Sequence, residues 1–166
     1  MDIKEMDFDD LLAAAVKSEI NSREVYEYMA ERSDNFVTVE RFQFLAAEEE
    51  KHERFVRMIH ERSFGGKELH VPEKSPVPMP FIRFEDNMKD SEIIEQAMDA
   101  EIASRDFYKK IAEKAEEEGQ DDEIVRTMEY LSGMEQNHYN ILESESERIA
   151  EFEQFDEYWP EMHIGP

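Results

Sequence analysis

One stretch of sequence decides the fold, because it occurs twice. Residues 15–26 read AVKSEINSREVY and residues 97–108 read AMDAEIASRDFY, with identical alanine, glutamate, isoleucine, serine, arginine and tyrosine positions. A looser pair lies downstream of each copy. Residues 44–52 read FLAAEEEKH and residues 130–138 read YLSGMEQNH, and both contain a glutamate followed three positions later by a histidine. The chain is therefore a duplication of one structural unit.

Both copies lie in segments whose apolar residues recur at the spacing of an α-helix. Thr38 is expected to cap the second helix and Asp90 the third, since their side-chain oxygens accept hydrogen bonds from the free backbone N–H groups of a first turn. The four expected helices cover about residues 9–32, 39–62, 91–118 and 122–152.

The links between these helices differ in length. The first and third links are short, which makes the helices that they join antiparallel neighbours. Residues 63–89 form the second link and include four prolines, so this link cannot be helical throughout. It is long enough to cross the whole bundle. We therefore expect an all-α antiparallel four-helix bundle of two duplicated hairpins joined by a crossover, formed by residues 1–153, and an aromatic C-terminal tail at residues 154–166.

Composition excludes several kinds of partner and site. The formal net charge of the 166 residues is −24, which disfavours nucleic acid and anionic membranes and suits either a well-solvated surface or a funnel for cations. The sequence contains no cysteine, so disulfides, iron–sulfur clusters and cysteine-ligated zinc are excluded within it. No apolar run reaches the roughly 20 residues of a membrane span, and no secretion signal is visible. A cytoplasmic location is expected.

Six ionisable residues fall on the inward seams of the expected helices. Residues three, four and seven positions apart share one face of a helix, and by this spacing a glutamate or a glutamate–histidine pair of each helix faces the core at mid-height. Four buried carboxylates would repel one another strongly unless cations lay between them. Two divalent ions would balance their charge, and carboxylates with one histidine per metal suit iron or manganese. The six are Glu19, Glu49, His52, Glu101, Glu135 and His138.

Other polar residues surround these seams. Tyr26 and Tyr108 lie two turns beyond a glutamate and are expected either to hydrogen-bond a ligand carboxylate across the bundle or to pack in the core. Arg23 and Arg105 flank the seam and are expected to form ion pairs with carboxylates such as Glu53. The remaining histidines do not fit the pattern and are expected at the surface: His60, His70 and His163.

The segments Glu19-x-x-Ser22-Arg23-x-x-Tyr26 and Glu49-x-x-His52, with Glu101 and Glu135-x-x-His138, resemble the ferritin-like superfamily. The resemblance is greatest to the di-iron domain of rubrerythrin and covers about residues 9–150. It implies two bound iron ions, for which manganese or zinc can substitute. It further implies that Glu49 and Glu135 bridge the metals. Glu19 with His52 and Glu101 with His138 would complete the two sites, although the sequence alone leaves the histidine–glutamate pairing open.

Two features depart from the rubrerythrin pattern. Rubrerythrins usually carry a cysteine-ligated rubredoxin domain, which a sequence without cysteine cannot form. They also carry an additional metal-binding glutamate at the position of Ser104. The resemblance implies a di-iron carboxylate oxidoreductase of the oxidative-stress response, most simply a homodimer. It would reduce hydrogen peroxide or O₂ with electrons from an external donor such as a rubredoxin-type protein. The alternatives are a ferroxidase for iron storage or detoxification, and a non-catalytic metal-binding or sensor bundle.

Overall fold

The computed structural model describes residues 5–77, 79–80, 82–83 and 88–158, with the backbone alone for residues 152, 153 and 155–158. These residues form four helices and no strand, which confirms the predicted all-α bundle. None of the described helices is long and apolar enough to cross a lipid bilayer. The helices are α1 (Phe8–Arg32), α2 (Phe36–Phe64), α3 (Asp90–Glu117) and α4 (Asp122–Tyr158).

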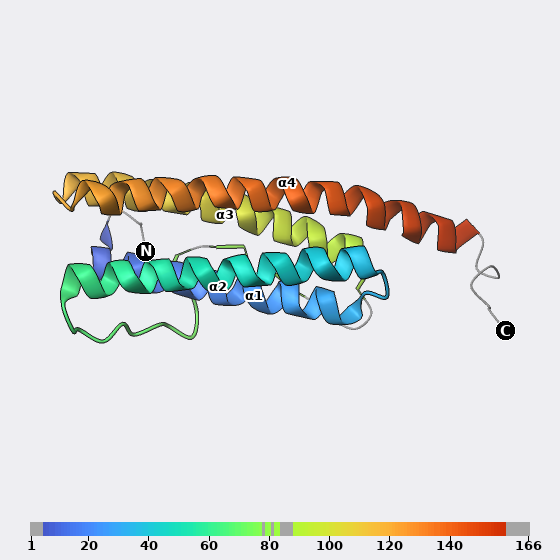
Figure 1. Cartoon of the computed structure of the whole chain (residues 1–166), viewed down its shortest axis with the longest axis horizontal. Coiled ribbons are helices and arrows are strands. Elements are labelled where there is room, and N and C mark those ends of the chain that lie inside the picture. Colours follow the sequence, from blue (N-terminus) through green and yellow to red (C-terminus); the bar gives the residue numbers. More distant parts are fainter. Residues whose placement is uncertain (1–4, 78, 81, 84–87, 159–166) are drawn as a thin grey trace.

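The helices are arranged as two antiparallel hairpins, α1 with α2 and α3 with α4 (Figure 1). Gly65, at a φ of +45°, ends α2 in the left-handed conformation that glycine adopts without strain. The following link leads back to the opposite end of the bundle, so α3 runs parallel to α2 (Figure 1). This is the crossover that the prolines predicted.

Two predicted N-caps are wrong. The N-cap of α2 is Asn35 and not Thr38, because the Asn35 side chain accepts hydrogen bonds from the backbone N–H groups of Val37 and Thr38. Asp90 is the first residue of α3 rather than its cap. Its carboxylate instead lies 3.0 Å from the guanidinium of Arg32, an ion pair between helices α3 and α1 that no local pattern reveals.

The last helix is longer than predicted. We expected α4 to end at Phe152, but it continues to Tyr158 and projects beyond the rest of the bundle (Figure 1). The predicted boundary between residues 153 and 154 thus lies inside a helix, and the division of the chain there stays a prediction. The rest of the expected aromatic tail, residues 159–166, lies outside the described residues, as does His163.

His60 was expected at the surface, but it is 2% exposed. Its Nε2 atom lies 2.6 Å from Oδ1 of Asp9 at the start of α1, and its ring packs 5.0 Å from that of Phe64. The carboxylate satisfies the ring nitrogen, so the remaining ring surface can be buried among apolar neighbours. His70 is exposed, as predicted.

The buried apolar side chains form two separate clusters along the bundle. The first includes Leu12, Val56 and Leu131, and the second includes Met29, Phe42 and Leu142. On α2 and α4 the buried glutamate and histidine lie in sequence between the residues of the two clusters. A polar layer thus interrupts the core at mid-height.

Candidate metal centre

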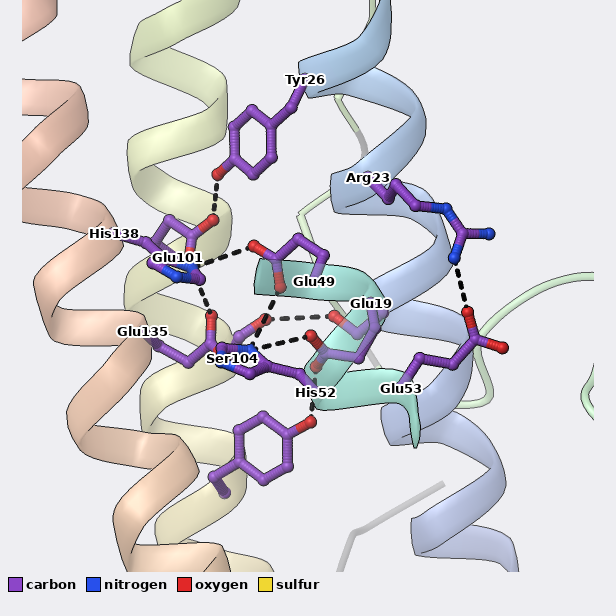
Figure 2. A network of polar contacts seen from close by, with 12 residues as sticks. Glu19, Arg23, Tyr26, Glu49, His52, Glu53, Glu101, Ser104, Glu135 and His138 are labelled. Atoms are coloured by element: carbon purple, nitrogen blue, oxygen red, sulfur yellow. Dashed lines mark hydrogen bonds and ion pairs between the residues drawn. The ribbon is translucent and has the colours of Figure 1, made fainter. Parts of the chain in front are cut away.

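The polar layer consists of the six residues that the inward seams predicted. α1 and α3 each contribute one glutamate, and α2 and α4 each contribute a glutamate and the histidine one turn later. The structure brings all six together, and none is more than 2% exposed. Their side chains converge from the four helices on one point (Figure 2). The six are Glu19, Glu49, His52, Glu101, Glu135 and His138.

One half of this cluster is built around His52. Its Nδ1 atom lies 3.0 Å from Oε1 of Glu135, 3.3 Å from Oε2 of Glu49 and 3.4 Å from Oε2 of Glu19. One nitrogen thus faces three carboxylates from three different helices. Among these carboxylates, Glu19 belongs to α1, the partner helix of His52 in the first hairpin.

The other half is built around His138 in the same way. Its Nδ1 atom lies 3.0 Å from Oε1 of Glu49, 3.6 Å from Oε2 of Glu101 and 3.8 Å from Oε2 of Glu135. The imidazole ring stacks on that of the other histidine, with 5.0 Å between the ring centroids. Glu49 and Glu135 therefore face both histidines, whereas Glu101 faces His138 alone. This settles the spatial pairing that the sequence left open.

The two tyrosines connect the halves across the bundle. The hydroxyl of Tyr108 on α3 donates to Oε1 of Glu19 on α1 at 2.5 Å. The hydroxyl of Tyr26 on α1 donates in turn to Oε1 of Glu101 on α3 (Figure 2). Of the two roles expected for these tyrosines, the structure shows the hydrogen bond across the bundle to a carboxylate of the cluster. Each hydrogen bond holds the Oε1 atom of its carboxylate. The Oε2 atom of Glu19 is left directed at His52, and that of Glu101 at His138.

The electrostatics of the cluster favour added positive charge. Burial, with the neighbouring Glu49 carboxylate, raises the pKa of Glu19 to about 8. Burial and the charges of Glu49 and Glu19 also raise the pKa of Glu135 well above its usual value. Burial opposes the charged form of His138, but Glu49 and Glu101 outweigh it and raise the histidine pKa to about 10. The crowding of buried carboxylates thus makes this cluster a favourable place for added positive charge.

Glu49 and His52 form ion contacts with the opposite charge. Burial favours neutral Glu49, yet the imidazole of His138 outweighs that effect and holds the Glu49 pKa well below its usual value. Burial likewise opposes the charged form of His52, but Glu135 and Glu19 dominate and raise the His52 pKa. Glu49 and the two imidazoles thus stabilise one another's charged forms.

The residues present fit a pair of metal ions. Each of the six side chains has at least one buried nitrogen or oxygen atom without a hydrogen-bond partner in the described part of the chain. Buried polar atoms are rarely left so. Glu49, His52, Glu135 and His138 each offer a ligand atom within 4.8 Å of the others. Two divalent ions would balance four carboxylates, and mixed carboxylate and imidazole donors suit iron or manganese.

The residues around the cluster are less regular. Arg23 forms the predicted ion pair, with Nη1 2.7 Å from Oε2 of Glu53 (Figure 2). Arg105, its counterpart in the repeat, instead donates from Nη1 to the amide oxygen of Gln136 at 2.6 Å and also contacts Asp106. The expectation of an ion pair at Arg105 holds only for the adjacent Asp106.

Sequence analysis missed one buried carboxylate. Glu145 is 1% exposed. It accepts a hydrogen bond of 2.5 Å from the hydroxyl of Thr38 and lies 3.0 Å and 3.3 Å from the guanidinium groups of Arg148 and Arg41. The signal was present, because Glu145 lies seven residues after His138 on the same seam. Glu145 is not one of the six cluster residues. Its contacts with Thr38 and Arg41 connect α4 to α2.

Comparisons with known proteins agree with this geometry. The model of the rubrerythrin family matches residues 10–146. A solved structure of a hypothetical protein from Pyrococcus furiosus has 32% sequence identity and a TM-score of 0.77, and the match covers 91% of this chain and 95% of that one. No curated protein matches the sequence.

Proposed function

We propose, because this chain belongs to the rubrerythrin family, that it is a di-iron carboxylate oxidoreductase that reduces hydrogen peroxide or O₂. One observation carries the proposal. Six buried side chains of ligand type meet at one point and have nitrogen and oxygen atoms without partners among the described residues. Such an arrangement is unfavourable by several kcal/mol, on the order of the penalty for a buried unpaired charge, unless cations occupy it.

The ligand roles follow from the distances. We assign Glu19 and His52 to one iron, because Nδ1 of His52 lies 3.4 Å from Oε2 of Glu19. We assign Glu101 and His138 to the other, because Nδ1 of His138 lies 3.6 Å from Oε2 of Glu101. Glu49 and Glu135 face both histidines, so we assign them as the shared ligands. Imidazole and carboxylate donors in this ratio match the ligand set of di-iron bundles.

When bound, two ferrous ions supply the two electrons that, with two protons, convert one hydrogen peroxide molecule into two water molecules. The protein's residues set the conditions. Tyr26 and Tyr108 fix the Glu101 and Glu19 carboxylates through one oxygen each, which leaves the second oxygen free to bind. Apolar clusters on both sides of the polar layer limit the access of bulk water.

The electrons for the next cycle come from outside these residues. The sequence has no cysteine and hence no cysteine-ligated iron of its own, so we propose an external donor of the rubredoxin type. Peroxide is our first choice of oxidant, because the family match is to rubrerythrin. The proposed assembly is a homodimer.

Anaerobic titration with ferrous iron tests the proposal. We expect two irons per chain, followed by oxidation that is faster with peroxide than with O₂. A Glu49→Ala, Glu135→Ala double variant is expected to lose both irons. A control that removes two exposed carboxylates, Glu50→Ala with Glu143→Ala, is expected to keep them.

Three outcomes would contradict it. Fewer than two irons in the wild-type chain, or two irons in the double variant, would overturn the centre itself. Ferrous iron that stays reduced under peroxide and O₂ would favour a metal-binding or sensor bundle. Light scattering separates the remaining alternative, because a shell of many subunits would indicate ferroxidase and iron storage whereas our proposal requires a dimer.

A further inference from the structure

Exposed apolar side chains gather on the face of the bundle that α2 and α4 form. Within the described part of the chain six large apolar side chains are exposed, and all of them belong to these two helices. The six are Phe36, Val37, Phe44, Phe55, Met58 and Tyr130. Single exposed apolar residues are common on any protein, but their collection on one face indicates an interaction site.

A pocket of about 340 Å³ lies at one end of this face. Phe55 and Met58, near the end of α2, line it together with Tyr130, near the start of α4. The buried side chains of Ile59 and Ile124 also belong to its lining. This pocket, called the Phe55 pocket below, can therefore receive large apolar side chains from another element.

The Phe55 pocket is poor in acidic residues although the chain is rich in them. Its lining includes Arg62, Arg126 and a single carboxylate, Glu123, whereas the chain has 43 acidic and 19 basic residues. Arg62 contacts Asp121 and Glu123, but the exposed Arg126 forms no ion pair with any residue in the described ranges. A segment that is both apolar and acidic complements such a pocket.

The extension of α4, residues 151–158, has this composition. It reads EFEQFDEY, with aromatic residues at positions 152, 155 and 158, four acidic residues and no basic residue. The backbone is helical to Tyr158, and positions three apart lie along one side of a helix. An amphipathic helix that lays its apolar side into a groove is a common mode of recognition between proteins.

The extension of one chain cannot enter the Phe55 pocket of the same chain. Both belong to α4, and the helical rise of 1.5 Å per residue holds them about 40 Å apart. Figure 1 shows the start of α4 and its extension at opposite ends of the bundle. If two copies are related by a two-fold axis across the helices, their α4 helices run antiparallel, and each extension points toward the pocket of the other copy.

We infer that two copies of this chain associate through the face of α2 and α4, with residues 151–158 of each copy in the Phe55 pocket of the other. The inference rests on the homodimer that is part of the proposed function and names its interface. A second pocket, of about 540 Å³, lies at the other end of the same face and is lined by Val37, Phe44 and Ile141. The same pairing covers this pocket as well.

Cross-linking tests the arrangement directly, because a chain without cysteine makes each introduced thiol unique. Thr127→Cys places a thiol in the Phe55 pocket, and Gln154→Cys places one at an exposed position of the extension. After subunit exchange between these two iron-loaded chains, we expect a short bismaleimide to join one to the other and neither to itself. Lys109→Cys, at an exposed position of α3, replaces Thr127→Cys as the control and should not be joined to Gln154→Cys.

Removal of apolar surface from the pocket tests the strength of the contact. Met58→Ala with Tyr130→Ala should raise the dimer dissociation constant on the order of a hundredfold, because large buried side chains dominate interfaces. Both residues are exposed in the single chain, so folding and the two irons should be retained. Tyr139→Ala is the matched control, since this tyrosine of the same helix bonds Glu143 and lines neither pocket. Sedimentation velocity over a dilution series measures the constant.

The extension should show the same dependence. Phe152→Ala with Phe155→Ala should weaken the dimer to a similar extent. Combination with the pocket variant should add little further, because both changes remove one shared contact. Full additivity of the two effects would overturn the placement of the extension in the pocket.

The other outcomes separate this inference from the proposed function. A dimer that the pocket variant leaves intact would overturn the interface and keep the proposed function. Slower reduction by a rubredoxin-type donor in that variant, with the dimer unchanged, would assign the face to the donor instead. Cross-linking of Thr127→Cys to itself would overturn the antiparallel arrangement. A chain that binds two irons as a monomer would overturn the interface and the proposed dimer but not the centre, whereas a dimer without iron would overturn the centre alone.

Discussion

The two hairpins agree at the candidate metal centre and differ immediately around it. Each supplies a glutamate, a tyrosine and a glutamate–histidine pair, and the distances in the two halves are alike. Outside this set the correspondence ends. The repeat position of Glu53 is Tyr139, so Arg105 lacks the carboxylate that Arg23 has and bonds Gln136 instead. The two hairpins thus share the six cluster residues and differ in the residues around them.

The largest expected effect comes from breaking the centre at its shared ligands. Glu49→Ala should reduce binding from two irons to fewer than one per chain, because Glu49 faces both histidines. Glu19→Ala and Glu101→Ala should each leave about one tightly bound iron. Iron analysis after gel filtration measures this, with Glu50→Ala as the control. Unequal losses at Glu19 and Glu101 would show that the two halves are not equivalent.

The pH dependence of the metal-free protein should be the next largest effect. The native pKa of Glu19 is raised to about 8, so from its unfolded pKa of 4.5 upward the native state holds a proton that the unfolded state has lost. The native pKa of His138 is raised to about 10, and the stability that it contributes is present below pH 6.5 and lost as the pH rises toward 10. Both effects lower the free energy of unfolding between pH 6.5 and 8, by roughly 1–3 kcal/mol.

Thermal melting at several pH values measures this slope. Iron or zinc should remove it, since bound metal replaces the protons and binds more tightly as the pH rises. A melting temperature that rose from pH 6.5 to 8 without metal would show that the cluster does not retain protons in the folded state.

A smaller effect should follow from Glu145, which has Ile59 at its repeat position and so marks another difference between the hairpins. Glu145→Ala leaves the Thr38 hydroxyl and two guanidinium groups without their carboxylate. We expect a loss of about 1–3 kcal/mol in stability and no change in iron content. Chemical denaturation with and without iron checks both, against Glu143→Ala. Loss of iron would connect Glu145 to the centre.

The smallest effect should appear at the arginines outside the centre. Arg23→Gln removes a partly exposed ion pair and should lower stability by about 0.5 kcal/mol. Arg105→Gln should have a similar effect, although its main partner is an amide. The salt dependence of unfolding distinguishes them, because only the Arg23 variant loses an interhelical charge pair. Equal salt dependence would remove this difference between the hairpins.

The sequence predicted the centre better than its surroundings, for a physical reason. The six cluster residues follow from helical spacing, which is a property of single helices, and from the repulsion expected where the inward seams of four helices bring carboxylates together. The histidine–glutamate pairing depends on the spatial order of the helices, so spacing alone left it open. His60 was placed wrongly because its partner, Asp9, is 51 residues away. Asn35 and Thr38 both have cap-forming side chains, and only the turn between α1 and α2 decides between them.

The reciprocal tyrosine bonds have a consequence for connectivity. Each hairpin carries the hydroxyl that fixes the other hairpin's carboxylate, so neither half completes its own centre. The crossover contributes no member of the six, and its Val77 and Ile82 are buried in the two apolar clusters. A chain cleaved once within this link should therefore stay associated and keep its iron.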